Sequence, residues 1–233
     1  EVLDAYPRTL DEDVAKLKAA GVDAVFAPNP REMYPNGPRT TIHPGEAGRI
    51  LEGAHRPTHF AGVLTVVNKL FTITHCDHAF FGEKDYQQLL LIQQMVTDLN
   101  MEVQVHGVPI VREADGLAKS SRNVYLSDEE RELALTLSAA LTAGAFVAEQ
   151  GPAVVLQTAG SILDAASGID VDYLELRGTD LSDTPEDGEA RLLVAARVGT
   201  TRLIDNVGVP LGTGFKGLDD GGEGGEPAEN AGE

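Results

Sequence analysis

Apolar residues recur at helical spacing in several stretches of this chain. Leu10, Val14 and Leu17 would share one face of a first helix, which Thr9 and Glu12 can open as a T-x-x-E capping box. Ser127 and Glu130 repeat that pattern ahead of a longer apolar-faced stretch. The same spacing predicts further helices at about 58–74, 86–99, 127–150 and 154–166.

Short apolar runs rich in β-branched and aromatic residues separate the first of these helices. They predict strands at 23–27, 78–81 and 102–108. A stretch from Pro28 to Pro57 holds six of the twelve prolines and reads as irregular. Strands that alternate with helices of this length favour a parallel sheet with crossover helices.

The pattern changes after about residue 110. Two helices are followed by three strand-like runs at 171–177, 191–198 and 202–209. The tripeptide Gly199–Thr201 is short enough to form a hairpin turn between the last two runs. This part of the chain is typical of a small α+β domain.

We therefore expect an α/β protein with three parts. Residues 1–110 form a Rossmann-like nucleotide-binding domain with a parallel sheet, and residues 111–211 form a small C-terminal α+β lid domain. Residues 212–233 are rich in Gly, Asp and Glu, which predicts an acidic, disordered tail. The chain opens with a helix rather than a strand, so we expect its first domain to be truncated at the N-terminus.

Charge and cysteine content narrow the class of protein. The net charge is −19 over 233 residues, which argues against nucleic acid or an anionic membrane as partner. Cys76 is the single cysteine, and this fits a reducing cytoplasm better than a disulfide framework. No apolar run is long enough to span a bilayer. In such an acidic chain, any cations near a candidate anion site become informative.

The strongest candidate site is the segment FFGEKDYQQ, at residues 80–88. A strand runs into Gly82 and a helix follows, and open α/β sheets place ligands at the carboxyl ends of their strands. Lys84 can supply a charge to a phosphate, Asp85 can accept from ribose hydroxyls, and Gln88 lies one helical turn beyond Lys84. A solvated Glu-Lys-Asp helix cap is the alternative.

A second candidate is LAKSSRN, at residues 117–123. Ser120 and Ser121 stand between Lys119 and Arg122, which together make a compact set of phosphate donors. The segment lies at the expected domain junction, where a loop can close over a nucleotide. A polar interdomain linker is the alternative.

Histidines offer a third candidate, with no metal site expected. His59 falls in the first turn of the helix that Thr58 can cap, where a surface or capping role is the alternative to catalysis. His55 and His59 have HxxxH spacing, but Pro57 interrupts the helix and no third ligand is near. Cys76 has no identifiable partner and reads as an inert core residue.

Together these segments resemble the signature segments of bacterial pantothenate synthetases, most closely those of actinobacteria. The resemblance is carried by HRPTHFAGV, FFGEKDYQQ and VREADGLAKSSRNVYLS, in that order. It continues through YPRT near the start, VDYLELR, and RLLVAARVGTTRLIDN. It covers nearly the whole chain except the acidic tail, and it implies a HUP-type nucleotidyltransferase fold related to class I aminoacyl-tRNA synthetases.

The resemblance implies roles for individual residues. Lys84 and a KMSKS-like loop would be catalytic, and Gln88 would hold pantoate. The implied catalytic residues are Lys84, Ser120, Ser121 and Arg122. The implied ATP contacts add Gly82, Glu83, Asp85, Val111 and Lys119. The implied pantoate contacts are Gln88, Val63, Val66 and His59.

The implied activity is a ligase reaction that joins pantoate to β-alanine through a pantoyl adenylate, with release of AMP and pyrophosphate. ATP with Mg²⁺, a cytoplasmic location and a homodimer are implied in the same way. The family's HIGH-like segment with two histidines has no counterpart here, and His43, His55 and His59 do not replace it. The chain alone should then hold half a site and be inactive. Rival readings are another adenylate-forming enzyme of this fold, or a non-catalytic nucleotide-binding or dimerisation module.

Overall fold

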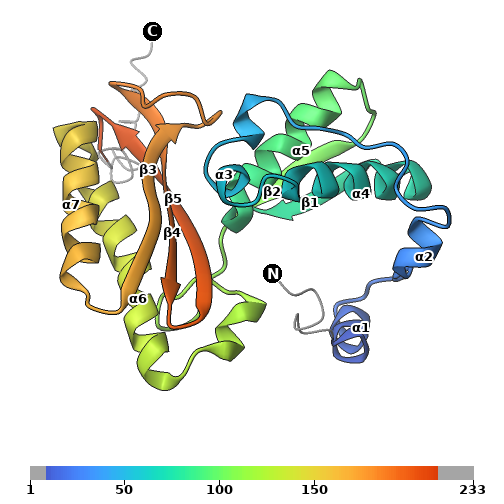
Figure 1. The fold of residues 1–233 in the computed structure, drawn as a ribbon, viewed down its shortest axis with the longest axis horizontal. Helices are drawn as coiled ribbons and strands as arrows, with labels where there is room; N and C mark the ends of the chain where they lie inside the picture. The colour runs from blue at the N-terminus through green and yellow to red at the C-terminus, as the bar shows by residue number, and fades with distance from the viewer. Residues whose placement is uncertain (1–8, 215–233) are drawn as a thin grey trace, which may run out of the picture. The chain divides into compact units, whose positions relative to one another are not determined.

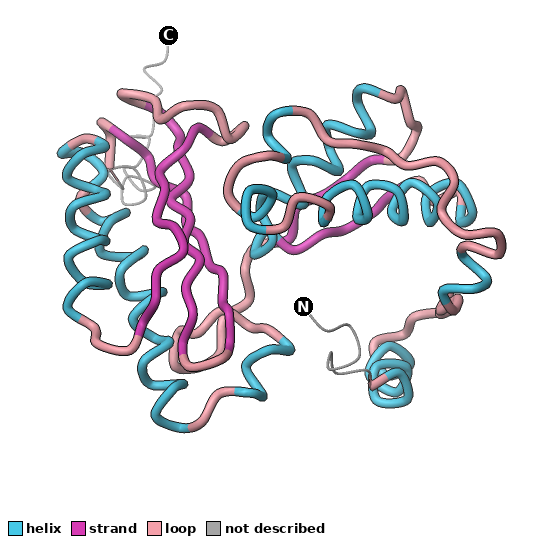
Figure 2. The backbone as a smooth tube through the Cα atoms, in the orientation of Figure 1, coloured by secondary structure: helices cyan, strands magenta, loops and turns pink. Residues whose placement is uncertain are grey.

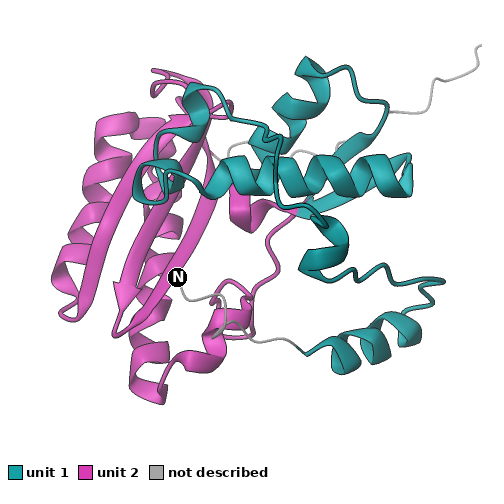
Figure 3. Cartoon of the chain, turned by 45° about the vertical axis from the view of Figure 1, so that its right-hand side comes forward, with its two compact units in different colours: residues 1–81, 88–107 teal, residues 82–87, 108–233 magenta. Residues whose placement is uncertain are grey.

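The N-terminal half of the chain has a buried apolar cluster, formed by helices α4 (His59–Thr74) and α5 (Tyr86–Asp98) and two strands. The computed structural model describes residues 9–214, which divide into two compact units, 9–81 with 88–107 and 82–87 with 108–214 (Figure 3). The YPRT segment up to Arg8 and the tail beyond residue 214 therefore lie outside the described residues. The expected domain limits at 110 and 211 remain predictions.

In the first unit, a two-stranded parallel sheet is covered on one face by two helices. Ala79, Phe81 and Val105 point from the strands into the same cluster as Phe60 of α4 and Ile92 of α5. The elements are α4 (His59–Thr74), β1 (His78–Gly82), α5 (Tyr86–Asp98) and β2 (Gln104–Val108), in sheet order β1-β2 (Figure 1). These four elements confirm the expected α/β pattern.

Two expectations for the first helix and the run after it are wrong. Thr9 precedes α1 (Leu10–Ala19), but its hydroxyl lies 3.5 Å from the Asp13 carboxylate and caps no backbone amide. Residues 23–27 form no strand, and Phe26 is 53% exposed. A strand is stabilised by ladder hydrogen bonds to a neighbour, and within the described residues no strand pairs with this run.

The stretch between Pro28 and Pro57 contains more structure than its proline content indicates. Asn29 accepts hydrogen bonds from two amides and forms a capping box with Glu32. Short helices punctuate the stretch: α2 (Pro30–Met33), η2 (Glu46–Gly48) and α3 (Glu52–His55).

The second unit is a three-stranded antiparallel sheet with two helices packed on one face (Figure 2). Its strands run in the order β3-β4-β5, and Val198 pairs with Thr201 across a two-residue turn in which Gly199 has φ +58°. The turn confirms the predicted hairpin. The elements are α6 (Asp128–Phe146), η5 (Ala148–Gln150), α7 (Pro152–Ala165), β3 (Ile169–Gly178), β4 (Gly188–Val198) and β5 (Thr201–Leu211).

Close packing in the second unit rests on small residues and on one capping box. Ala134 and Ala159 are fully buried on the helices, and Leu192 and Val194 project from β4 into the same core. Ser127 accepts from the Glu130 amide at 3.2 Å, and its own amide donates to the Glu130 carboxylate at 2.9 Å. The capping box predicted here is therefore confirmed. Over residues 9–214, no helix combines the length and apolar character needed to cross a membrane.

Candidate functional site

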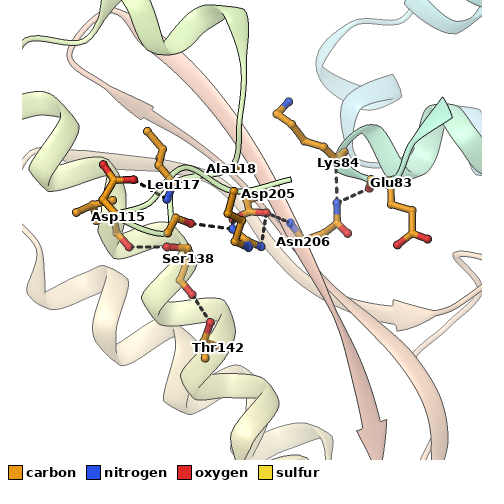
Figure 4. A network of polar contacts seen from close by, with 12 residues as sticks. Glu83, Lys84, Asp115, Leu117, Ala118, Ser138, Thr142, Asp205 and Asn206 are labelled. Atoms are coloured by element: carbon orange, nitrogen blue, oxygen red, sulfur yellow. Dashed lines mark hydrogen bonds and ion pairs between the residues drawn. The ribbon is translucent and has the colours of Figure 1, made fainter. Parts of the chain in front are cut away.

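The segment that carries Lys84 follows β1 and belongs to the second unit. The Asn206 amide group on β5 donates to the carbonyl oxygens of Glu83 and Lys84, at 3.0 and 2.9 Å (Figure 4). Arg191 on β4 binds the Glu83 carboxylate at 3.0 Å and the Asn206 side-chain oxygen at 2.7 Å. The main chain on both sides of Lys84 is thus held by polar side chains of the antiparallel sheet.

Tyr86 fastens the same segment at its other end. Its hydroxyl donates to the carbonyl oxygen of Thr179 at 2.7 Å, and the Arg191 guanidinium lies 4.3 Å from the centre of its ring. Burial raises the pKa of the Tyr86 hydroxyl, with Arg191 acting in the opposite direction. A raised pKa keeps this hydroxyl neutral at pH 7, and only the neutral hydroxyl can donate the hydrogen bond to Thr179. A 3-10 turn, η3 (Glu83–Asp85), follows β1 and leads into α5, which begins at Tyr86 as predicted.

The second candidate segment is built on a tight turn that is clamped to β5. Arg112 binds Asp205 through two bonds of 2.7 and 3.0 Å, and it also donates to the carbonyl oxygen of Gly116. Gly116 has φ +97°, a conformation that favours glycine, and its amide closes the turn on Glu113. Asp205 is buried, so this bidentate pair is a strong positional constraint on the turn.

Beyond the turn, Ser120 begins the short helix η4 (Ser121–Tyr125). Its hydroxyl accepts from the Arg122 amide at 3.3 Å. The Asn123 side-chain amide donates to the carbonyl oxygen of Ala118 at 3.1 Å, while its side-chain oxygen is buried with no hydrogen-bond partner among the described residues. The loop is therefore internally bonded, and it keeps one acceptor unsatisfied.

The structure brings the two candidate segments together in the second unit. Lys84, Ser120 and Arg122 line one cavity, together with Asn123 and Asp205. Its volume is about 10 Å³, which is room for about one water molecule. Lys84 is 15% exposed, and its ammonium group lies 3.9 Å from the Asp85 carboxylate. A phosphate group would have to enter at the rim, or the loop would have to move outward.

The remaining residues of the predicted nucleotide set lie around this cavity without lining it. Val111 and Lys119 face each other across the turn, joined by a backbone bond of 2.9 Å, and Val111 is 60% exposed. Ser121 is also exposed. Gly82 has an ordinary φ of −69°, and a Cβ there would meet no described atom within 4 Å. Neither conformation nor protein packing explains a glycine at this position.

The residues predicted to hold pantoate belong to the first unit. His59, Val63 and Val66 follow i, i+4, i+7 spacing along α4, so they share one face of that helix. His59 lies 3.4 Å from the Arg56 guanidinium, and both valines pack against the core of the first unit. Gln88 stands on α5 in the same unit. The substrate set and the nucleotide set thus come from different compact units.

The polar supports of Lys84 and of the loop were not predicted. Arg112, Asp205 and Asn206 fall inside segments that carry the family resemblance, yet sequence reasoning gave them no role. A usable signal was present, because Asp205 and Asn206 interrupt an apolar strand run, where a polar pair needs a partner. Arg191, at the start of another such run, was missed in the same way.

Within the described residues, the side chains do not provide a metal site of their own. Across residues 9–214, no group of three or more His, Cys, Asp or Glu side chains is placed to hold a metal ion. The donors near Lys84 do not fit a resident Mg²⁺, which prefers six oxygen ligands and often takes several of them from phosphates and water.

These features define an α/β enzyme with two elements suited to binding phosphate. One is a lysine that follows a parallel strand, and the other is a loop with cationic and hydroxyl side chains. The chain belongs to the pantoate–β-alanine ligase family, whose model matches residues 1–208. It is 97% identical to a pantothenate synthetase of Corynebacterium jeikeium (strain K411) over 233 residues, the whole of this chain and 76% of that protein. A Nocardia farcinica pantothenate synthetase is 62% identical over 93% of this chain and 68% of that protein.

Solved structures agree with this assignment. A pantothenate synthetase from Thermus thermophilus matches with a TM-score of 0.85 and 47% identity, over 89% of this chain and 77% of that one. A pantoate–β-alanine ligase from Francisella tularensis, complexed with β,γ ATP and β-alanine, matches with a TM-score of 0.71 and 33% identity. That match covers 88% of this chain and 71% of the other. The family prediction is confirmed.

Proposed function

We propose that this chain supplies the nucleotide-phosphate site for the adenylation step of ATP-dependent pantothenate formation, at the cavity of Lys84, Ser120 and Arg122, and that it holds half of the full active site. The observation that supports this most directly is the meeting of two segments far apart in the sequence at that cavity. Both are anchored by buried polar contacts rather than by apolar packing alone. Such preorganised donors stabilise charge that develops on a phosphate during reaction.

The reaction proceeds in two steps. A pantoate carboxylate oxygen attacks the α-phosphorus of ATP, and the bond to the pyrophosphate oxygen breaks, giving pantoyl adenylate and pyrophosphate. The β-alanine amine then attacks the acyl carbon and loses a proton, and AMP leaves as pantothenate forms. Lys84 and Arg122 offset the negative charge that gathers around phosphorus, while Ser120 and Ser121 donate hydrogen bonds.

The other predicted residues take supporting roles in this proposal. Gly82 leaves room beside the main chain for the nucleotide, and Asp85 accepts from its ribose. Lys119 adds charge to the rim of the loop. The pantoate contacts are assigned to the first unit, at Gln88, Val63, Val66 and His59. The remaining nucleotide contacts are assigned to Glu83 and Val111.

Three further assignments accompany the reaction. Mg²⁺ would arrive with the ATP phosphates, since the described protein side chains do not hold it by themselves. The protein would work in the cytoplasm as a homodimer. The nucleotide- and pantoate-binding domain would end near residue 110, with the small domain at 111–211.

Exchange of labelled pyrophosphate into ATP tests the first step. The assay compares this chain with the longer Corynebacterium jeikeium relative, with and without pantoate. We expect both proteins to bind ATP and the relative alone to show pantoate-dependent exchange, because this chain holds half of the site. Exchange by this chain as well would show that its own residues complete the site. Exchange by neither, with no ATP binding, would favour a non-catalytic module.

Substitution of Lys84 gives the residue-level test. Lys84→Gln should weaken ATP binding about tenfold or more, because it removes a charged donor to phosphate. Lys16→Gln on the exposed helix α1 is the matched control, since it changes the net charge equally. Equal ATP affinity in both variants, measured by titration calorimetry, would remove Lys84 from the nucleotide site.

A further inference from the structure

The first unit contains a second cavity that the proposed reaction does not use. It measures about 320 Å³, within the range of about 300 to 1,000 Å³ typical of small-molecule sites. Its walls are a loop that follows α2 and one side of α4. The lining residues are Met33, Tyr34, Pro35, Asn36, Gly37, Pro38, Arg39, Thr40, Ile42, Thr65, Asn68 and Lys69.

Local contacts hold the shape of this cavity. The Thr65 hydroxyl accepts from the Ile42 amide at 2.9 Å and donates to the carbonyl oxygen of Ala61 at 2.6 Å, which ties the loop to α4. Gly37 has φ +75°, and its amide bonds to the carbonyl oxygen of Tyr34 at 3.1 Å, which closes a tight turn. Met33 is buried beneath. The cavity is therefore built by specific contacts on both walls.

The charge in this cavity is entirely positive. Its lining includes Arg39 and Lys69 but no Asp or Glu, in a chain whose net charge is −19. Lys69 lies over the Tyr34 ring, with its ammonium nitrogen 5.5 Å from the ring centre. Arg39 makes no hydrogen bond or ion pair within the described part of the chain, so its donors are available to a ligand. Cations without counter-charges in a cavity favour an anionic ligand.

Most of the α4 residues in this cavity lie away from the face assigned to pantoate. At about 100° per residue, Thr65 lies about 160° and Asn68 about 140° round the helix from Val63. Lys69 lies about 120° from Val63 but only about 60° from Val66, so it borders the pantoate face. A ligand in the cavity therefore contacts Thr65 and Asn68 on a different side of α4 from Val63.

We propose that this cavity binds a small organic phosphate monoester. A phosphate monoester carries about −1.5 to −2 charge at neutral pH and three acceptor oxygens, which matches one guanidinium and one ammonium group. Arg39 can bind it bidentately, and Asn36, Asn68 and Thr40 add hydrogen-bond donors. The apolar lining from Met33 and Ile42 accommodates the organic part.

Titration with three probes tests this site: glycerol 3-phosphate, inorganic phosphate and glycerate. Binding is followed by calorimetry and by the amide signals of Gly37, Thr40 and Lys69 in ¹⁵N–¹H spectra. We expect glycerol 3-phosphate to bind most tightly and to shift those amides. Equal binding of inorganic phosphate would contradict the organic-phosphate assignment. Tighter binding of glycerate would contradict it as well and would identify a carboxylate site.

Variants separate this site from the nucleotide site. Arg39→Gln or Lys69→Gln should weaken glycerol 3-phosphate about tenfold or more and leave ATP affinity unchanged. Lys84→Gln should do the reverse, and Lys16→Gln should change neither. Loss of glycerol 3-phosphate binding in Lys84→Gln alone would overturn the second site and leave the proposed function standing. Loss of ATP binding in Arg39→Gln would overturn the independence of the two sites.

Discussion

Asp205 is a buried carboxylate within a strand that is otherwise largely apolar, and Arg112 is its ion-pair partner. We expect Asp205→Ala to lower the free energy of unfolding of the second unit by about 3 kcal/mol, because it leaves the partner charge unpaired beside the core. Urea titration followed by tyrosine fluorescence measures the loss.

A paired substitution distinguishes an unpaired charge from a cavity as the cause. Arg112→Met together with Asp205→Leu should be more stable than Asp205→Ala, since no buried charge then lacks a partner. Equal instability of the two variants would show that the ion pair itself contributes little. In either case the loop should lose its fixed position, which a weaker ATP affinity would report.

Asp115 provides a test of pH dependence at the same turn. The pKa of its carboxyl group lies below the ordinary value of 3.8, mainly because the Leu117 amide donates to it at 3.1 Å, with Arg131 as a further cause. Because the folded-state pKa is lowered, this carboxylate stabilises the turn fully at neutral pH. That contribution disappears as the pH falls below about 3.8 through the folded-state pKa.

An NMR titration of the Asp115 carboxyl carbon measures this effect. We expect a midpoint below 3.8. In Arg131→Gln, the midpoint should rise but stay below that value, because the bond from the Leu117 amide remains. A complete return to the ordinary value in that variant would show that the ion pair, and not the backbone bond, lowers the pKa.

At the scale of elements, two sequence patterns typical of a capping box form different hydrogen bonds in the structure. Ser127 and Glu130 form a reciprocal box ahead of α6, whereas Thr9 turns toward Asp13 and leaves the amides of α1 uncapped. Side chains on α6 are buried in the core of the second unit, while those of α1 are all exposed. Packing against a core fixes the entry of a helix, and the sequence pattern alone does not report that packing.

Hydrogen exchange tests this difference. Ser127→Ala should speed exchange of the Glu130 amide about fivefold, which corresponds to the loss of about 1 kcal/mol of cap stabilisation. Thr9→Ala is the matched control and should leave exchange of the Glu12 amide almost unchanged. Similar acceleration at both positions would mean that Thr9 caps α1 in solution.

The longer helices and the β4–β5 hairpin were largely predictable, because the helices repeat a pattern over ten or more residues and the hairpin has a short turn between two apolar runs. The run at 23–27 shows the limit of that reasoning, since its apolar residues predict a strand but cannot supply a pairing partner. The proline-rich stretch shows the opposite limit. Its capping box at Asn29 and Glu32 lies in a helix of only four residues, too short for periodicity to reveal.

At the scale of the whole molecule, the sequence pointed to candidate phosphate donors but not to the residues that position them. Lys84, Ser120 and Arg122 were selected as phosphate donors by type and spacing, and they line one cavity. Long-range contacts that position them join residues 93 to 122 positions apart, as between Arg112 and Asp205 and between Asn206 and Lys84. Such long-range pairs have no local pattern. For the same reason, the cavity around Arg39 and Lys69 became visible only in the folded chain.

Two glycines on the helices of the second unit differ in how crowded their surroundings are. A Cβ at Gly144 on α6 would lie 2.9 Å from Leu192, 3.1 Å from the carbonyl oxygen of Val155 and 3.2 Å from Ala159. A Cβ at Gly160 on α7 would meet only Leu174, at 3.8 Å. Alanine favours a helix over glycine by about 1 kcal/mol where space allows.

We therefore expect Gly160→Ala to add about 0.5 to 1 kcal/mol to the free energy of unfolding of the second unit. Its melting temperature should rise accordingly. Gly144→Ala should lower it, because the crowded backbone oxygen cannot move aside as a flexible side chain can. Differential scanning calorimetry of both variants measures the contrast. If Gly144→Ala proved as stabilising as Gly160→Ala, α6 would have to stand farther from α7 and β4 than the structure places it, and the core of the second unit would be looser than its buried alanines indicate.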